Sequence, residues 1–195
     1  AGGKLLHTLE GHKAAVGTVC WSPDGCWFLS TDWNRHVKIW DAATWLCRWN
    51  LPHPLGPETG GADGTYSADW SPDSRRVATR SGIGGLAVWE LATNRSPRRV
   101  WSVRAHSSNL RSVDWSPDGR RIASGSEDTL VKVWDAATGR EMLSFDHPSW
   151  VPNNAWSPDS TRLATATRPA ATYGYIILIR DARKALGVNW EKRVE

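Results

Sequence analysis

The 195-residue sequence lacks any run that approaches the roughly 20 consecutive apolar residues of a membrane-spanning helix. It also lacks an opening stretch of positive, then apolar, then small residues, so no secretion leader is expected. It contains only three cysteines, Cys20, Cys26 and Cys47, and no two of them have Cys-x-x-Cys spacing. An odd set of this kind favours free thiols in a reducing compartment, and we therefore expect a cytoplasmic protein.

The sequence also has little excess charge and few groups arranged for chemistry. Its 24 basic and 20 acidic residues leave a net charge of +4, which is too balanced to indicate a nucleic-acid binder. The six histidines are scattered, and no Gly-rich phosphate loop runs from a strand into a helix. We therefore expect no cofactor, no metal site and no catalytic centre, and neither nucleic acid nor a membrane as partner.

Tryptophan, in contrast, is abundant, with 14 residues against two phenylalanines and three tyrosines. Its abundance comes from an internal repeat. Trp-Ser-Pro-Asp followed by Gly or Ser begins at Trp21, Trp70, Trp115 and Trp156, at intervals of 41 to 49 residues. A second marker, Trp followed by Asp or Glu, lies 19 residues after each of the first three, at Trp40, Trp89 and Trp134. A period of about 40–45 residues accommodates four short strands and their turns.

The third repeat shows the expected strands most clearly. Alternating apolar and polar residues predict a first strand over residues 110–115, and Pro117 and Gly119 supply the geometry of the turn that follows. Further strands are expected over residues 121–126, 130–134 and 141–145. Because all connections are short, the strands form an antiparallel meander, and neighbouring sheets must stack to cover their apolar faces. The fold class is therefore all-β, with almost no helix.

These repeats resemble the WD40 family, whose β-propeller blades carry Gly-His near the start and Trp-Asp near the end. Gly11-His12 begins the first repeat and Ala105-His106 the third, while His53 and His147 open the second and fourth. The resemblance covers essentially the whole chain and implies a β-propeller of four-stranded antiparallel blades, four of them in this chain.

The resemblance also divides the chain, which we expect to be one propeller segment over residues 1–195. Blades are expected at residues 11–52, 53–104, 105–146 and 147–195. The last is degenerate, because Arg180 stands where the second tryptophan is expected. Residues 4–10 are expected to form the fourth strand of a preceding or closing blade.

The third repeat contains His106, Ser124 and Asp128, a combination of residue types that also forms nucleophilic triads. The resemblance implies instead a hydrogen-bonded structural tetrad within a blade. The two complete sets are His12, Ser30, Asn34 and Trp40 in repeat one, and His106, Ser124, Asp128 and Trp134 in repeat three. A catalytic centre is normally built once, whereas this set recurs with the blade, so we interpret it as structural.

The turns of a meander lie alternately on two faces of the array. Insertions at residues 54–63 and 168–174 enlarge the face that carries the turns between second and third strands, and loops on a rigid scaffold often carry binding. The resemblance implies partner contacts on this top face at Trp33, Tyr66, Asn109, Arg111, Glu127 and Trp150. Trp, Tyr and Arg are enriched at interface hot spots. The alternative is that Trp33 and Trp150 pack on neighbouring blades.

The resemblance favours a non-catalytic scaffold that binds other proteins or peptides, as a segment of a larger regulatory or signalling protein. A structural repeat module without its own ligand is the main alternative, and an enzyme that uses the propeller channel ranks below it. We favour a fragment of a larger propeller, and the alternatives are a symmetric dimer of eight blades and a closed four-bladed ring. An unclosed array exposes two apolar blade faces and is expected to self-associate or to be only marginally stable.

Overall fold

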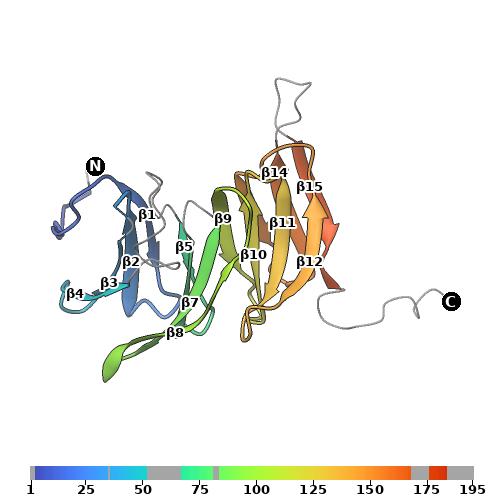
Figure 1. The fold of residues 1–195 in the computed structure, drawn as a ribbon. Coiled ribbons are helices and arrows are strands. Elements are labelled where there is room, and N and C mark those ends of the chain that lie inside the picture. Colours follow the sequence, from blue (N-terminus) through green and yellow to red (C-terminus); the bar gives the residue numbers. More distant parts are fainter. Residues whose placement is uncertain (1–2, 35, 52–66, 81–83, 168–175, 184–195) are drawn as a thin grey trace.

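In the computed structural model the chain is an all-β molecule of four antiparallel sheets, and the predicted fold class is confirmed (Figure 1). The structure describes residues 3–34, 36–51, 67–80, 84–167 and 176–183. The sheets follow one another in chain order as blades of a β-propeller, and the first and fourth blades lie at opposite ends of the row.

Each blade is a meander in which consecutive strands pair. Blades 1 and 2 contain β1 (Val16–Trp21), β2 (Trp27–Asp32), β3 (Val37–Asp41), β4 (Cys47–Leu51), β5 (Ala68–Trp70), β6 (Arg76–Arg80), β7 (Gly85–Ala92) and β8 (Arg95–Arg104). Blades 3 and 4 contain β9 (Leu110–Trp115), β10 (Arg121–Ser126), β11 (Leu130–Asp135), β12 (Glu141–Asp146), β13 (Asn153–Trp156), β14 (Arg162–Thr167) and β15 (Ile176–Asp181). The four strands predicted for the third repeat agree with β9–β12 to within one residue at each end.

The repeated marker forms the turn between the first and second strands of every blade. In blade 1 the Ser22 hydroxyl donates to Asp24 Oδ1 (2.6 Å) and accepts from the main-chain N–H of Trp27 (2.9 Å). The same pattern recurs at Ser71, Ser116 and Ser157. The residue that closes the turn has a positive φ in each blade: Gly25 (70°), Ser74 (59°), Gly119 (72°) and Ser160 (59°). The marker is therefore a local turn template that each repeat carries.

The hydrophobic core lies at the junctions between blades, where three apolar clusters join neighbouring sheets. At the junction of blades 3 and 4, Val131 and Val133 of β11 pack with Trp156 and Leu163. Equivalent clusters join blade 1 to blade 2 and blade 2 to blade 3. Blades 1, 2 and 3 thus present aliphatic residues of their third strands to the next blade, which packs its marker tryptophan against them.

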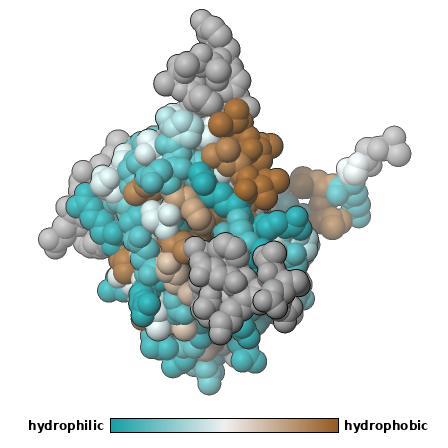
Figure 2. Space-filling model, turned by 90° about the vertical axis from the view of Figure 1, so that its right-hand side faces the viewer, coloured by the Kyte–Doolittle hydropathy of each residue, from teal (hydrophilic) through white to brown (hydrophobic). Residues whose placement is uncertain are grey.

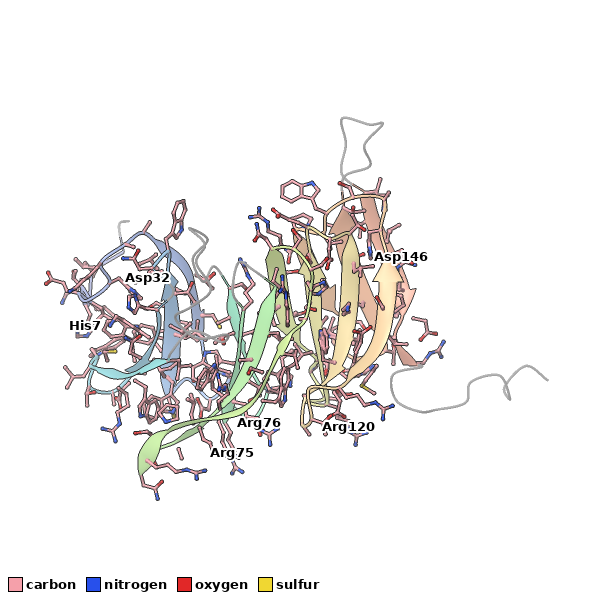
Figure 3. All side chains as sticks on the ribbon, in the orientation of Figure 1. His7, Asp32, Arg75, Arg76, Arg120 and Asp146 are labelled. Carbon is pink, nitrogen blue, oxygen red and sulfur yellow. The ribbon has the colours of Figure 1, made fainter. Side chains whose placement is uncertain are left out.

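The strand ends define two opposite faces of the array (Figure 3). Asp32, at the end of β2, lies at one edge, while Arg75, Arg76 and Arg120 lie at the other, beside the marker turns. We call the edge with Asp32 and the turns from second to third strands the top face. The edge with the marker turns is the bottom face.

Residues 4–10 form no strand in this structure, contrary to the expectation. A fourth strand pairs with the third strand of its own blade, and the described residues include no blade that precedes blade 1. His53 and the insertions at residues 54–63 and 168–174 lie outside the described residues, as does Tyr66.

Candidate functional site

A buried polar cluster ties the strands of blade 3 together. His106 Nε2 lies 2.8 Å from Ser124 Oγ, and the Trp134 Nε1–H donates to the same hydroxyl at 2.8 Å. His106 Nδ1 lies 3.0 Å from both carboxylate oxygens of Asp128. The structure therefore brings together all four side chains of the tetrad expected in this repeat.

The protonation of this cluster follows from its burial. Burial lowers the pKa of His106, although the Asp128 carboxylate opposes the shift, so the ring is neutral at pH 7. A neutral ring can donate through Nδ1 to Asp128 and accept through Nε2 from the Ser124 hydroxyl. Ser124 is fully buried and its oxygen also accepts from Trp134, so no substrate can reach that oxygen. The geometry is that of a structural tie between strands.

In blade 1 the expected tetrad is wrong in one member. His12 contacts Ser30 Oγ through Nε2 (2.5 Å), but its Nδ1 lies 2.7 Å from Asp32 Oδ2, and Asn34 takes no part. Asp32 is buried at the end of β2, whereas Asn34 is exposed and donates only its main-chain N–H to Asp32 Oδ1 (2.9 Å). A charged carboxylate is the stronger acceptor for the His12 N–H, and it stands two residues earlier in the turn.

Hydrogen bonds also set the ionisation of Asp32. Its burial alone would raise the pKa of the carboxyl group, but hydrogen bonds from His12 and from the main chain of His36 outweigh it and lower the pKa. Asp32 therefore stays ionised and holds the turn that places Trp33 on the top face.

Blades 2 and 4 keep only part of the cluster. The Trp89 Nε1–H donates to Thr79 Oγ1 at 3.0 Å, and His147 Nε2 lies 2.8 Å from Thr165 Oγ1. Arg180 occupies the tryptophan position in blade 4, and its Nη2 donates to the carbonyl of Asp146 at 2.8 Å. The blade that the sequence indicates as degenerate therefore retains its fold through a different contact.

Four of the predicted partner-binding residues form one cluster on the top face of blades 3 and 4. The Arg111 guanidinium donates through Nε to Glu127 Oε1 at 2.8 Å and lies 5.4 Å from the centre of the Trp150 ring. Asn109 lies beside them, and its carbonyl accepts from the main-chain N–H of Glu127 at 3.0 Å. Trp150 thus does contact the neighbouring blade, as the alternative interpretation holds. We call Asn109, Arg111, Glu127 and Trp150 the top-face cluster.

Trp33 lies on the same face but in blade 1, separated from the top-face cluster by blade 2. The Trp33 side chain is not buried: the residue is 54% exposed. Its main-chain N–H donates to the carbonyl of Ala15 at 3.1 Å, which fixes the turn that carries it. Trp33 therefore remains in contact with solvent on the top face.

An acidic pair that the sequence did not single out joins the first strands of blades 2 and 3. Asp69 Oδ2 accepts the main-chain N–H of Trp115 at 2.7 Å, and Asp114 Oδ2 accepts that of Trp156 at 2.8 Å. Burial and, second, the nearby Asp69 charge raise the pKa of Asp114 to about 7, and burial raises the pKa of Asp69. Asp114 therefore holds a proton below about pH 7.

Asp114→Asn is expected to make the chain less sensitive to pH. An unfolded aspartate titrates near pH 3.9, so the folded chain holds a proton on Asp114 that the unfolded chain releases between about pH 4 and pH 7. The free energy of unfolding consequently falls as pH rises through this window. Asparagine mimics the protonated acid and removes the fall. Urea unfolding at pH 5 and pH 8 should show the variant more stable than wild type at pH 8, by on the order of 2 kcal/mol.

The matched control is Asp118→Asn at the bottom face. Hydrogen bonds lower the pKa of Asp118 against the effect of burial, so this carboxylate is ionised at both pH values. Its substitution should change stability equally at pH 5 and pH 8. If Asp114→Asn keeps the pH dependence of the wild type, Asp114 is not the group that holds the proton.

A concave surface lies on the bottom face between blades 1 and 2, and the sequence did not indicate it. The groove has a volume of about 480 Å³. Trp27 and Trp49 form one wall with ring centres 5.1 Å apart, and Asp73 and Arg75 line the other. The β7–β8 hairpin, which is longer than its counterparts and reaches below blade 1 in Figure 1, also lines the groove with Leu91, Ala92, Thr93 and Asn94.

Among the residues that the structure describes, no three His, Cys, Asp or Glu side chains gather as they would around a metal ion. Cys20, Cys26 and Cys47 are free thiols. No described helix has the length and apolar character needed to cross a membrane.

Comparison with known proteins agrees with this geometry. The family model described as "WD domain, G-beta repeat" matches residues 3–41 and 97–135. The chain is 33% identical over 93 residues to the WD repeat-containing protein WDS homolog of Arabidopsis thaliana, an alignment that covers 47% of this chain and 17% of that protein. It is 30% identical over 93 residues to WD repeat-containing protein 1 of Gallus gallus, covering 47% of this chain and 14% of the relative.

A third relative is eukaryotic translation initiation factor 3 subunit I of Pyricularia oryzae. It is 29% identical over 87 residues, which are 45% of this chain and 24% of that protein. In all three relatives the matched region is therefore less than a quarter of the protein, and the similarity concerns the repeat.

Proposed function

The chain is a member of the WD40-repeat β-propeller family, and on this premise we propose that it is a non-catalytic scaffold whose top face binds another protein or a peptide. Proteins of this family generally act in protein–protein interaction. The proposed setting is a larger regulatory or signalling protein in the cytoplasm. The Pyricularia relative is by its name a subunit of a larger factor, which fits such a setting.

The top-face cluster is the observation that carries the proposal. Arg111 is held between the Glu127 carboxylate and the face of Trp150, so its guanidinium is oriented before any partner arrives. The Arg111 and Glu127 side chains are 37% and 25% exposed, and they leave a charged pair beside an aromatic surface. A partner segment with an apolar side chain for the tryptophan and polar groups for the charged pair matches this surface.

The proposal is tested with peptides selected from a random display library against the immobilised chain. We expect selected peptides to bind Arg111→Ala and Trp150→Ala at least about tenfold more weakly than wild type, because both changes remove a preorganised contact. Trp33→Ala should weaken those peptides that extend to blade 1. Affinities measured by isothermal titration calorimetry give the comparison.

Arg75→Ala is the matched control, since it removes an arginine from the bottom-face groove. Peptides that bind the top face should keep their wild-type affinity for this variant. Peptides that lose affinity for Arg75→Ala and not for Arg111→Ala would place binding in the groove beside Trp27 and contradict the proposal. A library that yields no binder would favour the structural module without a ligand.

A further inference from the structure

One position of the repeat changes its residue type at the bottom-face groove, the concave surface between blades 1 and 2. Three blades have an arginine as the first residue of their second strand, at Arg76, Arg121 and Arg162. In blade 1 this residue is Trp27. The strand register confirms the equivalence, because Trp27 pairs with the last residue of β3 as Arg121 pairs with the last residue of β11. Blade 1 therefore carries an indole where the other blades carry a guanidinium.

In blades 3 and 4 the arginine lies near the carboxylate of its own marker turn. Arg121 Nη2 is 3.3 Å from Asp118 Oδ2, and Arg162 Nη2 is 3.8 Å from Asp159 Oδ2. The corresponding carboxylate in blade 1 is Asp24, and no cationic side chain among the described residues forms an ion pair with it. Blade 1 thus keeps the carboxylate of this pair and lacks the cation.

Arg121 shows what such an arginine does at a junction between blades. Its side chain is buried and extends from blade 3 to blade 4. Nη1 donates to the carbonyl of Ala182 at 2.8 Å, and Nη2 donates to the carbonyl of Ser160. The guanidinium also lies 4.6 Å from the centre of the Trp156 ring. The junction of blades 3 and 4 is therefore a socket in which a guanidinium meets a carboxylate, two carbonyls and an aromatic ring.

The marker turns at the junction of blades 1 and 2 contact each other as they do in this socket. The Asp24 N–H donates to Ser74 Oγ at 3.0 Å. At the junction of blades 3 and 4, the Asp118 N–H donates to Ser160 Oγ at the same distance. Asp24 and Ser74 therefore stand where Asp118 and Ser160 hold the guanidinium of Arg121.

Leu91 matches Ala182 in the same way. The Leu91 N–H donates to the carbonyl of Arg75, and the Ala182 N–H donates to the carbonyl of Thr161, at 2.8 Å in each case. Arg75 and Thr161 each directly follow the residue that closes the marker turn. The junction of blades 1 and 2 therefore repeats the three positions that hold the guanidinium, and the residues at all three line the bottom-face groove.

The groove opens beside the tryptophan that replaces the arginine. Trp27 packs against Trp49, and both side chains line the groove, which has a volume of about 480 Å³. The face of an indole ring attracts a guanidinium. Arg48 of the same chain makes such a contact, since its guanidinium lies 5.6 Å from the centre of the Trp49 ring. The groove therefore combines an aromatic wall with the residues that correspond to the Arg121 socket.

The charged side chains that line the groove favour a cation. They are the carboxylates of Asp24 and Asp73 and the guanidinium of Arg75, so one negative charge remains uncompensated. Burial alone would raise the pKa of Asp24, but hydrogen bonds from Ser22 and from the main chain of Cys26 outweigh it and lower the pKa. Asp24 is therefore ionised at neutral pH.

We propose that the bottom-face groove binds an arginine side chain of a partner protein. The guanidinium meets the Asp24 carboxylate and the carbonyls of Ser74 and Leu91, and its plane lies against Trp27. The partner thus supplies the cation that Arg121 supplies from within the chain at the junction of blades 3 and 4. A guanidinium suits this set better than an ammonium group, because its donors lie in one rigid plane.

The groove is a separate surface from the other exposed features of the molecule. Hydrophobic residues gather at the blade 4 end of the row, onto which Figure 2 looks, and Ile177 and Ile179 there are 72% and 70% exposed. The groove lies between blades 1 and 2 on the bottom face, opposite the face that carries the top-face cluster. Arginine binding in the groove therefore does not depend on the proposed function of the top face.

The test titrates the tripeptide acetyl-Gly-Arg-Gly-amide into the ¹⁵N-labelled 195-residue chain and follows the indole N–H signals by nuclear magnetic resonance. Trp27→Phe and Trp49→Phe identify the two signals of the groove. We expect these signals to shift, with a dissociation constant on the order of 1 mM for a single side chain. Tripeptides with lysine or with citrulline, the uncharged analogue, in place of the arginine should bind at least about tenfold more weakly.

Substitutions in the groove separate its contributions. Asp24→Asn removes the charge that meets the guanidinium and should weaken the arginine tripeptide at least about tenfold. Arg75→Ala removes a like charge and should leave the affinity unchanged or higher. Trp27→Arg gives blade 1 the arginine of the other blades and should abolish binding, because the chain then fills the socket itself. The matched control is Asp159→Asn, the same turn position in blade 4, which should keep the wild-type affinity.

Four results would overturn the proposal. The first is that the Trp27 and Trp49 signals stay in place up to about 20 mM tripeptide. The second is that the lysine or citrulline tripeptide binds as tightly as the arginine tripeptide. The third is that Asp24→Asn keeps the wild-type affinity while circular dichroism shows it folded. The fourth is a shift of the Trp150 signal in place of the Trp27 signal, which would move arginine recognition to the top face.

Discussion

Trp134→Ala is expected to lower the free energy of unfolding by about 3–5 kcal/mol, the usual cost of removing a buried tryptophan. Trp134 is almost fully buried at the junction of blades 2 and 3, within the cluster that contains Leu86, Val88 and Ile122. The substitution leaves a cavity there and also removes the Nε1–H that donates to Ser124. Urea unfolding followed by circular dichroism measures the change.

Two further variants separate the contribution of the buried Trp134 ring from that of its hydrogen bond. Trp134→Phe keeps most of the apolar ring and removes the hydrogen bond, so it should cost only about 1–3 kcal/mol. Trp33→Ala removes the same side-chain type from an exposed turn and should change stability by less than about 1 kcal/mol. A cost for Trp134→Ala as small as that for Trp33→Ala would show that the cluster does not hold the blades together.

The sequence predicts the fold well because the information is local and repeated. Pro117 and Gly119 set a turn within four residues, and Ser116 closes it with hydrogen bonds to Asp118 and to the main chain. Each repeat carries such a turn, so the four copies together define where the strands begin and end in any one of them. This is why the strands of the third repeat agree with the structure almost residue for residue.

The sequence predicts the site less well because the site depends on contacts between segments. Asn34 aligns with Asp128, yet the carboxylate that reaches His12 belongs to Asp32, because the turn of blade 1 brings that side chain to the ring. Alignment of repeats places residues along a strand and does not report which polar group completes a hydrogen bond. The acceptor of the His12 hydrogen bond depends on the chemistry of the two groups, because the buried Asp32 carboxylate is a stronger acceptor than the exposed Asn34 amide.

Contacts between blades are the least visible in the sequence. Asp69 and Asp114 each stand immediately before a marker tryptophan, 45 residues apart, and nothing local indicates that the charge of one raises the pKa of the other. Blade stacking brings them together, because the first strands of successive blades lie side by side. The match between the bottom-face groove and the Arg121 socket becomes visible only for the same reason, once the junctions are compared position by position.

Gly84→Ala is expected to destabilise the chain by about 3–5 kcal/mol, although it adds a single methyl group. Gly84 has a φ of +80°, and a Cβ at this position would lie 2.2 Å from the carbonyl oxygen of His106. That oxygen belongs to the main chain of the segment before β9, so it cannot move unless this segment moves. The Gly84 carbonyl accepts the N–H groups of Ala105 (2.8 Å) and His106 (3.2 Å), so the displacement also breaks these bonds.

The cost of Gly84→Ala has two components, the penalty of a left-handed backbone and the steric clash of the added Cβ. Gly25→Ala separates them. Gly25 has nearly the same backbone strain, with a φ of +70°, but no atom lies within 4 Å of an added Cβ. It should therefore cost only the left-handed penalty of about 1–2 kcal/mol. The difference between the two variants, measured by urea unfolding, reports the clash with the segment that carries His106. Equal costs would mean that this segment shifts freely, and the tetrad of blade 3 would then not depend on its contact with blade 2.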